Sequence, residues 1–480
     1  GLPDNRSYLI EGGPGTGKTT LALQFLLEGA RQDESGLFIS LLQSRDEVND
    51  TATSHGWSLD NLHFVELPED VQQYTDTEQT VFDPAEVELD EVTTAIIDAI
   101  RRHRPRRFVL DSLSELNAIV QNDYQLRRQL VKIKRSLLGL DQPCTALFTS
   151  NRAVVEHQPT VHTIMHGSIR LLMDSKTSGE PRRRLVVEKV RGIDFDGGCH
   201  DMDIRAGGVI AYPTLSVAEP VDQRTETLAS GNSELDALFG GGLDRGSACL
   251  VMGTSGAGKS TLISCYAAAA ADAGHFASVY CFDEGRQTYL RRSRGLKLGV
   301  DEHINAGRIA LRQPVMGSLS PGKLLAEVRR DVIERNAKLV VFDSYTGWQQ
   351  MMAGQEQLDR RLHEMLSFLT SHNVLTLVTF NLPGTFGSLI QEQSIDASYL
   401  ADTVVLMRHF EAMGYVRRCI SVLKQRHGEH ERTIREIEFG EGGLRVGPPL
   451  AEFSGVLTGS PHYRGRKRDL LGEDSNDVDE

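Results

Sequence analysis

Two short glycine-rich segments carry the residue types that hold a triphosphate. They share the pattern Gly-x-x-x-x-Gly-Lys-Thr/Ser and run over residues 12–19 and 253–260. Their glycines let backbone N–H groups turn toward phosphate oxygens at a helix N-terminus, while the lysine reaches the β- and γ-phosphates and the last hydroxyl binds Mg²⁺. We expect ATP and Mg²⁺ at both segments, and ATP rather than GTP because no Asn-Lys-x-Asp motif follows. The expected nucleotide-binding residues are Gly13, Gly15, Thr16, Gly17, Lys18, Thr19 and Thr20 in the first segment, and Thr254, Ser255, Gly256, Ala257, Gly258, Lys259, Ser260 and Thr261 in the second.

A single aspartate ends an apolar run downstream of each glycine-rich segment. Asp111 and Asp343 each follow three apolar residues and precede a serine. A carboxylate at this place can complete the coordination of Mg²⁺, although an aspartate can also cap the next helix. The expected Mg²⁺ ligands are Thr19 and Asp111 in the first half of the chain, and Ser260 and Asp343 in the second.

The two halves differ where an acid–base group would be expected. In the second half Asp283 and Glu284 end an apolar run, and Glu284 comes 25 residues after Lys259. Adjacent carboxylates beside a γ-phosphate can orient and deprotonate a nucleophile, although a solvated strand end would look the same. At the same spacing the first half carries Leu42 and Gln43. A glutamine can position water but accepts a proton far less readily, so we expect the first half to bind ATP with weak or no hydrolysis.

Two basic pairs, Lys189 with Arg191 and Lys424 with Arg426, recur near the end of each half. Residues two apart on a strand point to the same face, so each pair could reach the γ-phosphate held by a neighbouring subunit. Positive charge supplied from a second subunit is the arginine-finger device. Spacing alone allows a basic pair on the surface equally well, and the recurrence of the pair favours the finger.

The elements that position these residues form a duplicated unit. Lys18 and Lys259 lie 241 residues apart, Asp111 and Asp343 lie 232 residues apart, and the basic pairs lie 235 residues apart, in the same order. The same landmarks in the same order indicate two copies of one domain. We place the first domain at residues 1–222, the second at 223–462 and a mobile charged tail at 463–480.

Each copy is predicted to be an α/β domain. Apolar runs at residues 8–10, 37–39, 108–110 and 374–380 lack polar alternation, which indicates strands buried on both faces of a sheet. Amphipathic helices lie between them, and we expect their apolar side chains to be core residues. These side chains are Leu126, Leu130, Ile133 and Leu137 in the first copy, and Leu358, Leu362, Met365 and Leu369 in the second.

Composition places the chain among ordinary globular proteins. Of its 480 residues, 40% are hydrophobic and 25% are charged, which suits two or three domains. Six cysteines without a Cys-x-x-Cys pair exclude a disulfide scaffold, and no apolar run approaches the roughly 20 residues that span a bilayer. We therefore expect a cytoplasmic protein. The formal net charge of −14 argues against nucleic acid as the main partner.

The combination of motifs resembles the RecA-like superfamily and, more closely, the KaiC family of double-domain ATPases. The resemblance rests on both glycine-rich loops, the adjacent Asp283 and Glu284, both Asp-Ser pairs and both Lys-x-Arg pairs, and it runs from Gly1 to about Pro461. It also rests on residues 230–238, which look like the segment that opens each domain of the family. No counterpart of that segment precedes Gly1, so we expect a first domain truncated at its N-terminus.

This resemblance implies two tandem RecA-like P-loop NTPase domains, each with a mostly parallel sheet flanked by helices. It implies a homo-oligomeric ring, typically a hexamer, with ATP between subunits, the Lys-x-Arg pairs acting in trans and a possible protein partner in signalling. It further implies autokinase activity in the second domain, where Ser398 matches the family's phosphorylated serine. The adjacent threonine position of the family holds Tyr399, which departs from a two-site phosphorylation cycle.

Three functions stay open at the level of sequence. The first is an ATPase and serine autokinase that uses Glu284 as its base. The second is a nucleotide-gated oligomeric scaffold with little catalysis, which Gln43 and Tyr399 favour. The third is a RecA-like DNA-dependent ATPase, against which the net charge and an aromatic content of 6% argue, because few rings are available to stack on bases.

Overall fold

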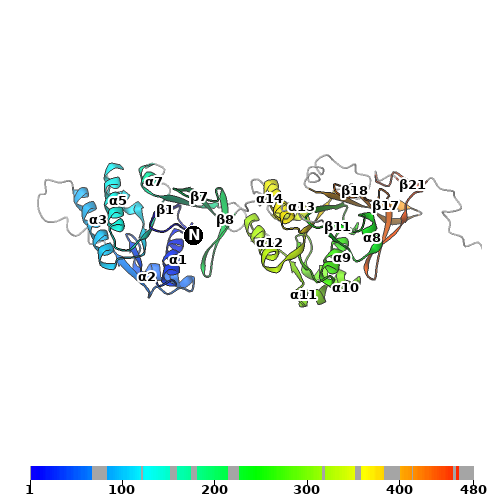
Figure 1. The fold of residues 1–480 in the computed structure, drawn as a ribbon, viewed down its shortest axis with the longest axis horizontal. Coiled ribbons are helices and arrows are strands. Elements are labelled where there is room, and N and C mark those ends of the chain that lie inside the picture. The colour runs from blue at the N-terminus through cyan, green and yellow to red at the C-terminus, as the bar shows by residue number, and fades with distance from the viewer. Residues whose placement is uncertain are drawn as a thin grey trace, which may run out of the picture. The chain divides into compact units, whose positions relative to one another are not determined.

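The protein folds as two compact units, Gly1–Thr214 and Leu215–Glu480, each built around its own sheet (Figure 1). The computed structural model describes residues 2–67, 84–120, 123–151, 159–174, 181–213, 226–315, 319–351, 358–382, 401–412, 414–457 and 461–463. The expected domain boundary at residue 222 and the expected tail, apart from Tyr463, lie outside these residues. Within the described residues, no helix combines the length and the apolar character needed to cross a membrane.

The first unit contains a nine-stranded sheet in the order β3-β2-β4-β5-β1-β6-β7-β8-β9. Neighbours from β3 to β6 pair in parallel, and β7, β8 and β9 extend the sheet with antiparallel pairings. The strands are β1 (Ser7–Gly12), β2 (Gly36–Ser40), β3 (Leu62–Glu66), β4 (Arg107–Asp111), β5 (Thr145–Ser150), β6 (Gly167–Asp174), β7 (Arg182–Val190), β8 (Cys199–Arg205) and β9 (Gly208–Tyr212). The helices are α1 (Lys18–Ala30), α2 (Arg45–Ser54), α3 (Pro84–His103), α4 (Leu113–Ile119), α5 (Asp123–Leu138) and α7 (Pro159–Ile164).

The second unit repeats this topology strand for strand, in the order β14-β13-β15-β16-β12-β17-β18-β19-β20. Its main strands are β12 (Ala248–Gly253), β13 (Phe276–Cys281), β14 (Ile309–Arg312), β15 (Ala337–Asp343), β16 (Leu375–Asn381), β17 (Thr403–Ala412), β18 (Tyr415–Gln425), β19 (Arg435–Gly440) and β20 (Gly443–Pro449). Two small pairs are added, β10 (Thr227–Leu228) with β11 (Leu243–Asp244), and β21 (Phe453–Ser454) with β22 (His462–Tyr463). The helices are α8 (Ser233–Leu238), α9 (Lys259–Asp272), α10 (Arg286–Gly295), α11 (Val300–Asn305), α12 (Pro321–Arg335), α13 (Tyr345–Met351) and α14 (Leu358–Ser371).

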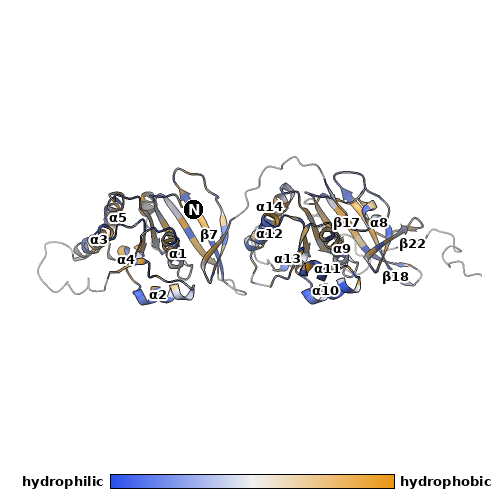
Figure 2. Ribbon diagram, turned by 60° about the horizontal axis from the view of Figure 1, so that its bottom comes forward, coloured by the Kyte–Doolittle hydropathy of each residue, from blue (hydrophilic) through white to orange (hydrophobic). Residues whose placement is uncertain are grey.

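Helices cover both faces of each sheet, so the central strands are buried from both sides. In the first unit α1 and α2 pack on one face, and α3, α4 and α5 pack on the other. Figure 2 shows apolar strands inside each unit and the largely hydrophilic helices α2 and α10 outside. The two tandem, mostly parallel α/β domains predicted from the unbroken apolar runs are therefore confirmed. The expected core residues of α5 and α14 are buried wherever their side chains are described, namely Leu126, Leu130, Ile133, Leu137, Leu362, Met365 and Leu369.

Candidate functional site

Each glycine-rich loop links a buried strand to the start of a helix, β1 to α1 in the first unit and β12 to α9 in the second. Gly17 and Gly258 precede the helices with φ values of 98° and 109°, a backbone conformation that favours glycine. A side chain at Gly17 would collide with Ile204, and one at Gly258 would collide with Phe439. The loops can therefore bring backbone N–H groups close to a phosphate at a helix N-terminus. The predicted nucleotide-binding residues 13–20 and 254–261 all lie in these loops and in the first turns that follow.

The loop lysines are held across their own loops. Lys259 Nζ donates to the carbonyl oxygens of Gly253 and Thr254, both at 2.8 Å, and Lys18 makes the two corresponding contacts in the first unit. Burial lowers the pKa of both lysines, to about 8 for Lys259, while nearby carboxylates oppose the shift. A buried ammonium beside a helix N-terminus is well placed to accept a phosphate group as its counter-charge.

The hydroxyl and carboxylate groups expected to hold Mg²⁺ lie together. Thr19 Oγ1 donates to Asp111 Oδ2 at 2.7 Å. In the second unit Ser260 and Asp343 border one cavity, and Thr379 Oγ1 donates to Asp343 Oδ1 at 2.5 Å. Hydroxyl and carboxylate oxygens are the ligands that Mg²⁺ prefers, so both sets of residues fit the ion.

A cavity of about 560 Å³ opens at the phosphate loop of the second unit. Its walls include the predicted side chains of Lys259, Ser260, Asp283, Glu284 and Asp343. Six further wall residues were not indicated by any motif, namely Arg292, Gly295, Leu296, Asn381, Arg418 and Phe439. The structure thus brings the lysine predicted to bind phosphate, the predicted Mg²⁺ ligands and both acids around one volume.

The two acids of this cavity are held in different ways. Asp283 Oδ2 accepts hydrogen bonds from Ser344 Oγ and from Asn381 Nδ2, the latter at 3.0 Å. Glu284 instead forms an ion pair with Arg292 through its Oε2. One carboxylate is therefore fixed by neutral donors and the other by a guanidinium.

The corresponding place in the first unit has no carboxylate. Leu42 is 73% exposed, and the backbone of Gln43 is tied into a turn by the Ser40 hydroxyl, which accepts from Gln43 N at 3.0 Å and donates to Gln43 O at 2.6 Å. An amide and an apolar side chain cannot accept a proton from a nucleophile. The phosphate-binding half of the site is thus present in both units, whereas the acid pair lies in the second.

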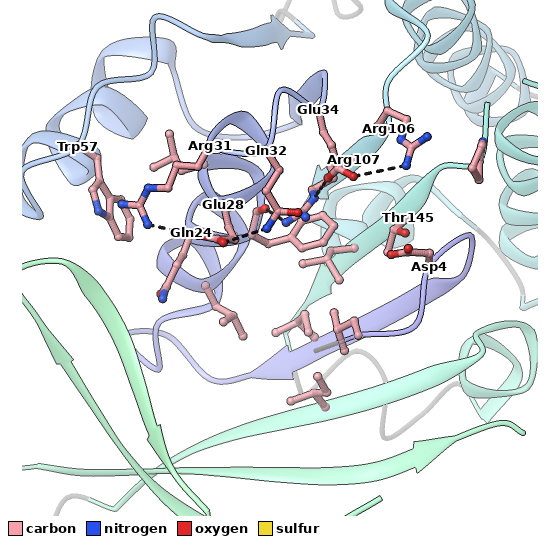
Figure 3. Close-up of a pocket in the computed structure, with 18 of the residues that line it drawn as sticks. Asp4, Gln24, Glu28, Arg31, Gln32, Glu34, Trp57, Arg106, Arg107 and Thr145 are labelled. Atoms are coloured by element: carbon pink, nitrogen blue, oxygen red, sulfur yellow. Dashed lines mark hydrogen bonds and ion pairs between the residues drawn. The ribbon is translucent and has the colours of Figure 1, made fainter. Parts of the chain in front are cut away.

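The first unit has a cavity of about 580 Å³, but it lies away from the phosphate loop, between α1 and the sheet (Figure 3). Polar and charged side chains on its rim pair with one another: Arg31 and Gln32 with Glu28, and Arg106 and Arg107 with Glu34. In the second unit Leu235 and Leu238 of α8, and Phe239 after it, are buried in the core cluster that also contains residues of α9. The size of the first-unit cavity therefore reflects a packing difference between the units and adds no reacting group.

The Lys-x-Arg pairs lie on β7 and β18 and just beyond, and they contact the segment that precedes the neighbouring strand, which in the first unit includes the end of α7. Lys189 Nζ donates to the carbonyl oxygens of His162 and Met165 at 2.7 and 3.1 Å, and Arg191 donates to that of Thr163 at 2.8 Å. In the second unit Lys424 Nζ donates to Ala401 O at 2.8 Å, and Arg426 forms an ion pair with Asp402 at 3.3 Å. Both pairs thus occupy the same place in the two units.

Two arginines that the motifs did not indicate touch the phosphate loops directly. Arg183 Nε donates to Gly15 O at 3.2 Å, and Arg418 Nε donates to Gly256 O at 3.1 Å. Arg418 also stacks on the ring of Phe439, with 5.0 Å from the guanidinium carbon to the ring centroid. The two arginines lie 235 residues apart, as the Lys-x-Arg pairs do, so the duplication itself was the signal that could have found them.

Within the described residues, one group of histidine and acidic side chains is compact enough to hold a metal ion. Ligand atoms of Glu11, His162 and Glu188 lie within 4.8 Å of one another. Glu188 pairs with Arg170, and Glu11 lies 2.9 Å from His162 Nε2, so the carboxylates already have donors beside them. The expected phosphoacceptor Ser398 and its neighbour Tyr399 lie outside the described residues.

Comparison with known proteins agrees with this geometry. The family model described as "ATPase: KaiC" matches the chain twice, over residues 1–216 and 228–451. The circadian clock protein KaiC3 of Synechocystis sp. is 25% identical to the chain, with 96% of the chain and 92% of that protein covered. The circadian clock oscillator proteins KaiC of Picosynechococcus sp. and Thermostichus vulcanus are 24% and 25% identical, with 96% of the chain and 89% of each protein covered.

Proposed function

The chain belongs to the KaiC family of ATPases, and from that membership we propose a Mg²⁺-dependent ATPase and serine autokinase whose phosphoryl transfer takes place in the second unit. The first unit binds ATP with weak or no hydrolysis. The observation that carries this proposal is the second-unit cavity, which Lys259, Ser260, Asp343 and Glu284 line together. A phosphate-binding amine, two Mg²⁺ ligands and a carboxylate base then surround one γ-phosphate.

Each side chain has a defined task in this scheme. The backbone N–H groups of the loop and Lys259 bind the β- and γ-phosphates, and Ser260 and Asp343 would hold Mg²⁺, which would neutralise phosphate charge. Glu284 accepts the proton of the attacking hydroxyl or water as the new oxygen–phosphorus bond forms and the bond to ADP breaks. Asp283, fixed by its neutral donors, orients the nucleophile beside it. The nucleophile is the hydroxyl of Ser398 in autophosphorylation and water in hydrolysis.

We propose that the chain assembles into a homo-oligomeric ring, and a hexamer is the first ring size to test. In this ring the two basic pairs reach the γ-phosphates of neighbouring subunits, namely Lys189, Arg191, Lys424 and Arg426. The recurrence of both pairs at the same place in the two units supports this role, since a ring repeats the same contact in each layer. Relatives named as circadian clock proteins support a role in cytoplasmic signalling through a protein partner.

A nucleotide-gated scaffold with little catalysis is the second candidate. The observation that favours it is the first unit, where an exposed Leu42 and Gln43 replace the acid pair while the phosphate loop is kept. A DNA-dependent ATPase has less support, because the chain carries a net charge of −14.

The proposal is tested with γ-labelled ATP and Mg²⁺, by mapping labelled sites and counting free phosphate in parallel. In Glu284→Gln, label on Ser398 and phosphate release should both fall to a small residual rate, while ATP stays bound. Glu302→Gln, which removes an exposed carboxylate from α11, is the matched control and should leave both signals unchanged. Added DNA should not raise the rate.

Each other outcome points to a different function. Free phosphate without label on Ser398 leaves an ATPase whose output is conformational. Neither signal with nucleotide still bound favours the gated scaffold. Turnover that is unchanged in Glu284→Gln contradicts the assigned base.

A further inference from the structure

We infer that Arg292 is the positioning residue of Glu284, and that the pair of side chains, rather than the glutamate alone, makes the second unit the reacting one. This inference deepens the proposed function and rests on Glu284 being the base. Arg292 lies on α10, two turns after Glu284, and both side chains border the same cavity.

The ion pair holds one oxygen of the carboxylate. A terminal nitrogen of Arg292 donates to Glu284 Oε2. The side chains of Glu284 and Arg292 are only 19% and 25% exposed, so the contact is largely shielded from water. A charge-assisted contact of this kind fixes the direction of the carboxylate far better than solvent does. Because the contact uses Oε2, Oε1 is the oxygen that can accept a proton.

The guanidinium of Arg292 also stacks on an aromatic ring. Its carbon lies 4.9 Å from the ring centroid of Tyr289, one turn earlier on α10, and Tyr289 is fully buried in the core of the unit. Among the described residues, neither Nε nor the second terminal nitrogen of Arg292 has a hydrogen-bond partner. Glu284 is therefore the group that balances this buried positive charge, and each of the two side chains depends on the other.

The duplication supplies an internal comparison. At an offset of 241 residues, α2 of the first unit corresponds to α10 residue for residue. The counterparts of Glu284, Tyr289 and Arg292 are Gln43, Val48 and Thr51. All three members of the arrangement are thus replaced together in the unit that lacks the acid, whereas the loop lysine and the Mg²⁺ ligands are kept.

The chemistry assigned to the pair is a proton transfer that the arginine does not enter. The O–H proton of serine or water moves to Glu284 Oε1, the oxygen forms its bond to the γ-phosphorus, and ADP leaves with the electrons of the broken bond. Arg292 stays on Oε2 and keeps the accepting oxygen directed at the nucleophile. A displacement of about 1 Å at such a group costs on the order of a hundredfold in rate.

The test is a kinetic cycle of Arg292→Gln and Glu284→Gln, singly and together, in the full chain. With the glutamate present, Arg292→Gln should lower kcat about tenfold to a hundredfold and change KM for ATP by less than about twofold. In the Glu284→Gln background the same change should have no further effect on kcat. Arg292→Lys should recover part of the loss because it keeps a positive charge within reach of Oε2. Arg291→Gln, an exposed neighbour on α10, is the matched control and should behave as the parent.

Three results would overturn the assignment. One is an equal loss of kcat from Arg292→Gln in both backgrounds, which would indicate a merely structural role. Another is a rise in KM at constant kcat, which would make Arg292 a nucleotide ligand. The third is full turnover in Glu284→Gln, which would contradict the assignment of Glu284 as the base and, with it, the positioning role of Arg292. The first two results contradict this inference alone, whereas the third contradicts the proposed function. If Arg292→Gln does not fold, Arg292→Lys in the two backgrounds carries the same comparison.

Discussion

The two glycine-rich loop sites share the residues expected to bind phosphate and differ in the residues proposed to react with it. Lys18 and Lys259 make the same pair of carbonyl contacts, and Asp111 and Asp343 each accept a hydrogen bond from a threonine of the neighbouring strand. The acid pair and its arginine occur in the second unit, where the first has an apolar side chain, an amide and a threonine. We expect nucleotide binding to depend on backbone shape and one lysine, and therefore to survive the loss of the groups proposed for proton transfer.

The largest expected effect comes from replacing the two loop lysines, Lys18 and Lys259, one at a time. Lys259→Ala should lower the rate of phosphoryl transfer about a hundredfold to a thousandfold, because it removes the buried positive charge of the lysine that stabilises the transferred phosphate. Lys18→Ala should leave the rate of phosphoryl transfer in the second unit unchanged, and it should reduce bound ATP from two molecules per chain to one. Equilibrium dialysis with labelled ATP measures the stoichiometry, and free phosphate measures the rate. Equal loss of rate in the two variants would contradict a division of labour between the units.

A second prediction concerns the packing difference beside α1 and α9. Leu238 of α8 is fully buried in the core of the second unit, whereas the first unit has a cavity beside α1. Leu238→Ala should lower the free energy of unfolding of the second unit by about 2–4 kcal/mol, since it removes buried methyl groups and leaves a void. Arg31→Ala, on the exposed rim of the first-unit cavity, should change stability by less than about 0.5 kcal/mol. The stabilities of the two variants are compared by thermal unfolding monitored by calorimetry.

A third prediction attempts to give the first unit what it lacks. In a Glu284→Gln background, Leu42→Asp with Gln43→Glu should produce slow ATP hydrolysis in the first unit, and adding Thr51→Arg should raise that rate about tenfold. Thr51→Arg without the acids should produce none. A rate that is the same with and without Thr51→Arg would show that the arginine is dispensable for positioning the base. Phosphate release in the presence and absence of Lys18→Ala assigns the activity to the correct loop.

The sequence was informative where chemistry is carried by contiguous residues and less so where distant strands meet. The glycine-rich loops, the two aspartates at strand ends and the buried parallel strands follow from local patterns, because loop conformation and burial on both faces restrict the residue types that can occur. Asn381 and Arg418 reach the site from strands far along the chain and match no motif. Arg292 lies eight residues after Glu284, yet its role depends on the rotation of α10 and on the ring of Tyr289 beneath it, which spacing alone does not fix.

The smallest expected effect concerns pH. Burial lowers the pKa of Lys259 to about 8, with Asp343 and Asp283 opposing the shift. The protonated lysine attracts phosphate, so affinity for ATP is full below this pKa and falls as pH rises through it. Between pH 8 and pH 9 the protonated fraction of such a group drops about fivefold, and the affinity of the second unit should drop with it. Isothermal titration of Lys18→Ala, in which the second site is read alone, measures the fall.

Lys259→Arg separates this lysine from every other group that titrates in the same range. A guanidinium stays charged throughout the measured interval, so the affinity of Lys259→Arg should vary little from pH 8 to pH 9, even if its absolute value is lower because arginine binds phosphate with a different geometry. An equal fall in the two proteins would place the titrating group elsewhere and would contradict a special burial of the second-unit lysine. A flat profile with arginine and a sloping one with lysine would tie the pH dependence to the buried amine itself.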